Sequence, residues 1–136
     1  MQPPSKHFHS FVWIDHREAK IFHFNDSESD RETISSTHPN QHIHHKANAR
    51  DSGHAAVDKE YLKRVAQALS HAGAILIAGP AGAKTELADY LKHSHPDIAK
   101  RISAVETLDH PTDGALLAYA RKFFVADDRM HAVPRH

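Results

Sequence analysis

The chain contains no cysteine among its 136 residues. This absence excludes disulfide bonds, thiolate metal sites and a cysteine nucleophile, and it is typical of a cytosolic protein. Basic and acidic residues are balanced at 17 each, so no bulk charge of either sign favours nucleic acid or a membrane surface. No run approaches the roughly 18 apolar residues of a membrane span, and residues 1–10 lack the apolar core of a signal peptide. We therefore expect a soluble, cytoplasmic protein without membrane contact.

Histidine, in contrast, is abundant, with 15 residues that gain positive charge below a pH of about 6.5. The densest group is His42, His44 and His45. Neutral imidazole is a good ligand for zinc, nickel or copper, so these three side chains are candidate metal ligands. Their spacing matches no known zinc motif, and no acidic residue lies within 38–49. A metal site and a set of exposed histidines both stay open.

The same histidines belong to the segment 38–56, whose only strong apolar residue is Ile43. So little apolar surface cannot offset the entropy of ordering, which predicts a flexible loop. Lys46 and Arg50 in this loop are candidates for contacts with phosphate groups, because such contacts require no preformed geometry.

Apolar periodicity predicts three strands followed by alternating helices and strands. The predicted strands are 8–14, 19–24, 31–37, 74–78 and 102–108, and helices are predicted to begin near Val57, Ala83 and Thr112. This order favours one α/β domain with a mixed sheet of about five strands and three main helices. We expect the domain to span residues 8–128, with a disordered tail at 1–7 and a frayed tail at 129–136.

The turn from Gly79 to Thr85 superficially resembles a phosphate-binding loop. Such a loop needs four residues between its glycines and a lysine directly after the second one. Here only two residues separate Gly79 from Gly82, and Ala83 comes before Lys84. A nucleotide-hydrolysing loop is therefore not indicated. The start of the following helix could still bind an anion such as RNA phosphate through Lys84 and Thr85, or the segment could simply form a tight turn.

For catalysis the sequence offers little. It has no Gly-x-Ser-x-Gly motif, and no pattern that calls for a cofactor. Asp109 and His110 are adjacent, but adjacency along the chain does not place an acid and a base in contact. The run is better explained as a helix entry in which Thr112 is the N-cap and Asp113 complements the helix dipole. A small metal-dependent or histidine-based hydrolase is kept as an alternative.

Three stretches carry a family resemblance: VWIDHREAKIFHF near the start, then ILIAGPAGAKTELADYL and AVETLDHPTDGALLAYARKFF. Together they resemble a family of small bacterial translational machinery proteins, which is related to the C-terminal domain of archaeo-eukaryotic class 1 release factors and Pelota. The resemblance covers about residues 11–124, and its most specific parts are 79–86 and 109–114. It implies a three-layer α/β/α sandwich similar to the kink-turn-binding ribosomal protein fold.

The resemblance also implies a function, which is a non-catalytic module that binds RNA, the ribosome or a translation protein. The chain has no Gly-Gly-Gln, the release-factor motif, so the resemblance does not imply peptide release. A protein–protein adaptor without RNA contact is a further alternative, and the sequence leaves the oligomeric state open. The candidate binding residues are Lys84, Thr85, Lys46, Arg50, Asp109, His110, Thr112 and Asp113.

Overall fold

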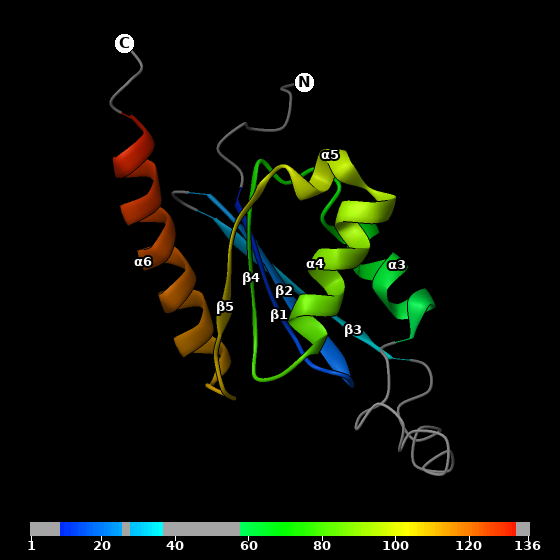
Figure 1. Cartoon of the computed structure of the whole chain (residues 1–136). Coiled ribbons are helices and arrows are strands. Elements are labelled where there is room, and N and C mark those ends of the chain that lie inside the picture. Colours follow the sequence, from blue (N-terminus) through cyan, green and yellow to red (C-terminus); the bar gives the residue numbers. More distant parts are fainter. Residues whose placement is uncertain (1–8, 26–27, 37–57, 133–136) are drawn as a thin grey trace.

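The computed structural model describes residues 9–25, 28–36 and 58–132, with side chains of the last helix described as far as Ala126. The elements, shown in Figure 1, are β1 (His9–Ile14), β2 (Glu18–Phe24), β3 (Ser29–Ser35), α3 (Lys59–Ala68), β4 (Ala74–Gly79), α4 (Ala83–Ser94), α5 (Pro96–Ala99), β5 (Ile102–Thr107) and α6 (Asp113–Ala132). None of these described helices combines the length and apolar character that crossing a bilayer requires.

The five described strands form one mixed sheet in the order β3-β2-β1-β4-β5. The hairpins β1–β2 and β2–β3 are antiparallel, whereas β1–β4 and β4–β5 are parallel. Strands β1, β3, β4 and β5 therefore run in one direction, and only β2 runs in the other. The middle strand, β1, joins the N-terminal hairpins to the C-terminal β–α–β unit.

The turn between β1 and β2 is closed by an aspartate rather than by an Asn-Gly pair. Asp15 Oδ1 accepts hydrogen bonds from the backbone N–H groups of Arg17 at 2.8 Å and Glu18 at 2.9 Å. The Asp15 N–H in turn donates to Glu18 O at 3.0 Å. This use of the side chain as a local acceptor is the reason that aspartate favours turns.

One face of the sheet is covered by α3 and α4, and the other by α6 (Figure 1). The first core includes Val12, Ile14, Ile21, Ile75 and Ile77 from the sheet with Tyr61, Val65, Leu69, Leu87 and Leu91 from the helices. The second includes Phe11, Trp13, Phe22, Phe24, Leu76 and Ala78 with Leu116, Ala120 and Phe124 of α6. Both faces of β1 and β4 are therefore buried. The three-layer sandwich predicted from the sequence is confirmed.

Strand β4 ends at Gly79, which lies against the end of β1. A Cβ atom at Gly79 would lie only 2.2 Å from the carbonyl oxygen of Ile14, so the position cannot hold a side chain unless the backbone shifts. The carbonyl of Gly79 accepts a hydrogen bond from the N–H of Leu108 at 3.0 Å. One glycine thus holds the ends of β1, β4 and β5 together.

The bounds of β3 differ from the predicted 31–37, because the strand covers Ser29–Ser35. The cause is the tight closure of the β2–β3 hairpin. Asn25 N–H donates to Glu28 O at 3.0 Å, and Glu28 N–H donates to Asn25 Oδ1 at 2.9 Å. This pairing brings the chain back into the sheet two residues before Arg31.

The first described helix begins at Lys59 rather than near Val57. Asp58 has extended backbone angles, and its side chain accepts from the N–H of Glu60, so it is the N-cap. Apolar periodicity alone places the helix start two residues too early, because it does not reveal the N-cap.

The remaining differences concern the ends of the domain. Helix α6 extends to Ala132 and so overlaps the tail predicted at 129–136, whose fraying stays a prediction. The predicted tail at 1–7 and the predicted flexible loop at 38–56 lie outside the described residues.

The interior position of β4 predicts a large cost for truncating its side chains. Leu76 is fully buried under α6, so Leu76→Ala should lower the free energy of unfolding by about 2–5 kcal/mol. Val105→Ala in β5, whose side chain is 41% exposed, is the matched control and should cost much less. Urea denaturation measures both. Equal losses would show that the burial of β4 does not carry the stability assigned to it.

The close contact at Gly79 predicts that even a methyl group is harmful there. Gly79→Ala should destabilise the protein by about 1–3 kcal/mol, because the backbone of Ile14 must move. Gly114→Ala is the control, since a Cβ there meets nothing within 4 Å and alanine favours the helix. Thermal unfolding should show a lower midpoint for the first variant only. A Gly79→Ala protein as stable as the parent would contradict the packing described.

Candidate functional site

The turns that follow the parallel strands lie at one end of the sheet, the lower end in Figure 1. Carboxyl ends of parallel strands are the usual place for ligands in α/β folds, because the connecting segments diverge there. In this protein α4 packs on one face of the sheet and α6 on the other. We call this end the strand-end surface and define it as residues 15–18, 35–36, 80–85 and 108–113.

Buried contacts fix the turn between β1 and β2 within the strand-end surface. The hydroxyl of Tyr61 donates to the backbone oxygen of Asp15 at 2.9 Å. Burial, and then the negative charges of Asp15 and Glu18, raise the pKa of Tyr61 far above its ordinary value, so it stays a neutral donor. The N–H of Ser36 donates to Arg17 O at 2.9 Å, which ties the end of β3 to the same turn.

The loop between β5 and α6 is held by the buried Trp13. Its indole N–H donates to the backbone oxygen of Asp109 at 2.8 Å. The ring of His110 packs edge-on against the indole, with ring centres 5.1 Å apart. His110 Nε2 lies 3.7 Å from the carboxylate of Asp15, and Nδ1 lies 3.5 Å from that of Asp109. The structure therefore brings His110 between two carboxylates while leaving its side chain 64% exposed.

The start of α6 is capped and charged as the sequence predicted. Thr112 Oγ1 accepts from the N–H of Ala115 at 3.2 Å, which is an N-cap interaction. Asp113 forms an ion pair with Lys20 of β2, with Nζ and Oδ1 3.0 Å apart, and a second one with Arg31 of β3. Asp113 therefore joins α6 to two strands, a packing contact that sequence spacing could not reveal.

Lys84 and Thr85 lie in the first turn of α4, at the same end of the molecule. The ammonium of Lys84 donates to the backbone oxygen of Ala81 at 2.6 Å, and Thr85 is exposed. The N-cap residue, Gly82, offers no side-chain acceptor to the first amides of the helix. The N–H of Thr85 donates to Gly82 O at 3.0 Å, and the amides before it have no side-chain cap. The start of α4 thus combines these amides with a cationic side chain.

A pocket of about 510 Å³ opens in the strand-end surface. Its lining residues are Asp15, Arg17, Glu18, Ser35, Ser36 and His110. Of these, the sequence had singled out only His110 as a binding candidate. The others come together because the β1–β2 turn contacts the end of β3 on one side and His110 of the β5–α6 loop on the other. Nothing in the local sequence signals that arrangement.

The other predicted site residues lie outside the described part of the chain. These are Lys46 and Arg50, and the metal candidates His42, His44 and His45. Among the residues that the structure does describe, no group of three or more possible ligands could hold a metal ion.

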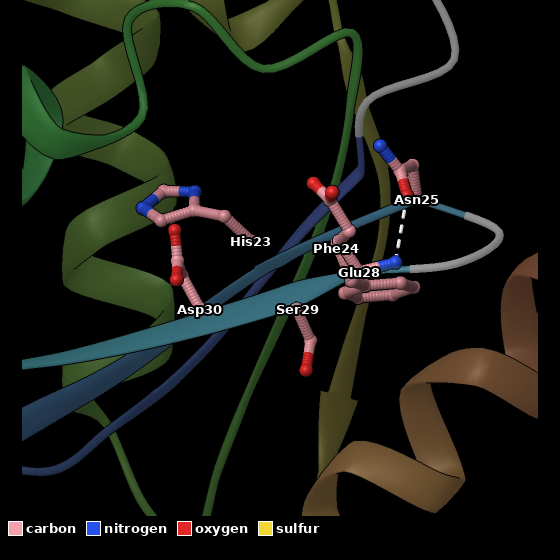
Figure 2. Close-up of a pocket in the computed structure, with 6 residues that line it drawn as sticks. All are labelled: His23, Phe24, Asn25, Glu28, Ser29 and Asp30. Atoms are coloured by element: carbon pink, nitrogen blue, oxygen red, sulfur yellow. Dashed lines mark hydrogen bonds between the residues drawn. The ribbon is translucent and has the colours of Figure 1, made fainter.

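A second pocket, of about 310 Å³, lies at the opposite end of the sheet, beside the β2–β3 hairpin (Figure 2). Figure 2 shows His23, Glu28 and Asp30 on one side of the hairpin and Ser29 on the other. With Glu32, this end carries three carboxylates near one histidine. Arg121 of α6 also reaches this end, where its guanidinium donates to the backbone oxygen of Asn25 at 3.2 Å.

Strand pairing also creates a contact that the sequence did not reveal. Ser10 Oγ lies 2.8 Å from His23 Nδ1, and His23 Nε2 lies 3.0 Å from Glu32 Oε2. Serine, histidine and a carboxylate in this order resemble a hydrolase triad. Ser10, however, is fully buried, so its hydroxyl is not accessible to a substrate. The chain of hydrogen bonds satisfies a buried hydroxyl, and it supplies no nucleophile to the surface.

Comparisons with known proteins support the fold. No protein-family model matches the sequence, and no curated protein matches it. The chain is similar to Pelota of Archaeoglobus fulgidus, with a TM-score of 0.60 and 16% identity over 85% of this chain and 31% of that one. It is also similar to Pelota of Thermoplasma acidophilum, with a TM-score of 0.58 and 18% identity over 87% of this chain and 34% of that one. A third similar structure is an archaeal translation termination factor, with a TM-score of 0.55 and 12% identity over 82% of this chain and 33% of that one.

The chain thus spans about a third of the length of the solved structures it matches. Identities this low establish a shared fold and leave activity open. The fold implied by the resemblance to release factors and Pelota is confirmed, and the structure has that fold over most of its length.

Proposed function

We propose that this chain is a non-catalytic, cytoplasmic, translation-associated module that binds RNA, the ribosome or a translation protein through its strand-end surface. RNA is the partner that the surface fits best. The observation that carries the proposal is the gathering of Lys84, Thr85 and His110 at one end of a sheet whose fold resembles that of a translation termination factor. Fold likeness alone would be a weak argument, so the chemistry of the surface matters more.

The charges of the two ends of the sheet support this choice. The strand-end surface presents exposed Arg17 and the cationic Lys84 beside uncapped helix amides. Arg64 lies next to it and donates to the backbone oxygen of Ser35 at 2.7 Å. The hairpin end instead carries Glu28, Asp30 and Glu32. The first end also carries the carboxylates of Asp15 and Asp113, but Asp113 is paired with Lys20 and Arg31, and Asp15 accepts hydrogen bonds within its own turn. Arg17, Lys84 and the amides at the start of α4 are therefore the groups at this end that can contact a polyanion.

The geometry also suggests how the surface works. Phosphate oxygens would accept hydrogen bonds from the guanidinium of Arg17 and from the first turn of α4. The exposed ring of His110 lines the same pocket as Arg17, and an unpaired base could stack on it there. Asp109 and Asp113 have structural roles in the loop. The backbone oxygen of Asp109 accepts from the indole of Trp13, and Asp113 forms ion pairs with two strands.

Segment 38–56 contains the predicted phosphate contacts Lys46 and Arg50. The described residues before and after this segment lie close to the strand-end surface. Before the segment, the N–H of Ser36 donates a hydrogen bond to Arg17 O. After it, the hydroxyl of Tyr61 donates to Asp15 O. We propose that Lys46 and Arg50 add to the same binding surface.

The proposal predicts salt-sensitive RNA binding that depends on the strand-end cations. A double change of Arg17 and Lys84 to Ala should weaken binding of a labelled RNA stem–loop with unpaired bases. It should also flatten the dependence of log K on log salt by up to about two units, roughly one for each lost phosphate contact. Fluorescence anisotropy at several salt concentrations measures both effects.

The matched control removes two lysines from elsewhere. Lys92 and Lys100 are exposed, and they lie near the other end of the helical layer, beyond the middle of α4 and after α5. Their double change to Ala alters the net charge equally but should leave RNA affinity nearly unchanged. Equal losses in the two variants would mean non-specific attraction only. No association of the parent protein with RNA or ribosomes at low salt would reject the RNA proposal in favour of an adaptor.

A further inference from the structure

The sheet has two edges, and they differ in how they are protected. At β3 three consecutive charged residues, Asp30, Arg31 and Glu32, are exposed. Charges on an edge strand prevent pairing with another chain. At the other edge, β5 has the sequence ISAVET, whose single charged residue is Glu106. Within the described residues no strand pairs with the outer side of β5.

The single charge of β5 is turned to the covered face of the sheet. Glu106 shares its strand face with Ala104, which packs against the core under α6. Burial and then the negative charge of Glu106 raise the pKa of Tyr119 in α6, which keeps the phenol neutral. Val105 points to the opposite face, because side chains alternate along a strand. It is 41% exposed, and among the described residues only Val105 and Val125 are large apolar side chains with such exposure. The centre of this edge is therefore apolar and uncharged.

The irregular part of β5 does not interrupt this centre. The register with β4 shifts between Ile102 and Ala104, at the start of the strand. From Ala104 to Thr107 the pairing is regular. The regular part thus has Val105 near its middle and a free outer edge of backbone N–H and C=O groups.

We propose that the outer edge of β5 binds a second copy of this chain, through antiparallel β5–β5 pairing about a two-fold axis at Val105. Such a pairing places Val105 opposite Val105 of the partner copy and Ala104 opposite Glu106. It covers the exposed valine and puts no like charges opposite each other. The same patch contacts itself, as a two-fold symmetric interface requires.

The charges explain why β5, and not β3, is the pairing edge. Antiparallel pairing of β3 with itself about Arg31 would place Arg31 opposite Arg31 and Asp30 opposite Glu32. Like charges directly opposite each other destabilise a strand pair. The β3 edge therefore repels a second copy, whereas the β5 edge is compatible with one.

This arrangement is independent of the proposed function. In an antiparallel pair the carboxyl ends of the two β5 strands point in opposite directions, so both strand-end surfaces stay accessible. A contact between two six-residue strands is small, and we expect a weak dimer whose population rises with protein concentration.

Sedimentation velocity over a range of concentrations tests the dimer directly. The parent chain should shift from monomer to dimer as concentration rises. Val105→Lys should abolish the shift, because two ammonium groups would meet at the axis, while circular dichroism should remain unchanged for this partly exposed position. Val125→Lys, the same substitution at the other exposed valine, should leave dimerisation intact.

The absence of cysteine offers a second measurement that does not depend on disrupting the edge. Directly opposite residues in an antiparallel pair have Cβ atoms about 4.5–5.5 Å apart, which is close enough for a disulfide after a small adjustment. Oxidised Val105→Cys should therefore form a covalent dimer rapidly, and Val125→Cys should not.

Several outcomes would overturn the proposal. If the parent chain stays monomeric at every concentration, the dimer proposal is wrong, and the β5 edge could pair only with a different extended chain. Loss of the dimer in Val125→Lys but not in Val105→Lys would place the contact on α6. Equal cross-linking of the two cysteine variants would indicate random collision.

Discussion

The parallel pairing of β1 with β4 is the contact on which the rest of the structure depends. It joins an N-terminal pair of hairpins to a C-terminal β–α–β unit, two parts that are far apart along the chain. Both strands are buried on both faces, so the pairing creates the two cores under α3–α4 and under α6. Gly79 permits it, because only a residue without Cβ can approach the carbonyl of Ile14 so closely.

The same pairing gives the molecule two chemically different ends. Because β1, β4 and β5 run in one direction, their following turns meet, and Trp13 and Asp113 fix the last of these turns. The opposite end contains the β2–β3 hairpin, where His23 lies among carboxylates. In the proposed function, the cations and helix amides of the strand-end surface would contact an anionic partner. Binding through positioned charges needs no catalytic group.

The two edges of the sheet differ in charge, and this difference bears on self-association. One edge is charged on its outer strand, and the other has an apolar centre at Val105. Since the centre of the β5 edge lies outside the strand-end surface, self-association and partner binding need not compete. An antiparallel dimer would present two equivalent binding ends that face away from each other, which would favour partners with repeated sites through increased effective concentration.

The sequence by itself determined the elements and the class of fold. Apolar periodicity marked β4 and α6, and Thr112 marked the entry of α6, because these signals act within a few residues. Local signals could not show which strands pair. The tertiary structure alone decided that Asp15 lies beside His110, that Asp113 binds cations of two strands, and that Ser10 is buried. Those contacts join residues distant in sequence, and the parallel register of β1 and β4 brings them together.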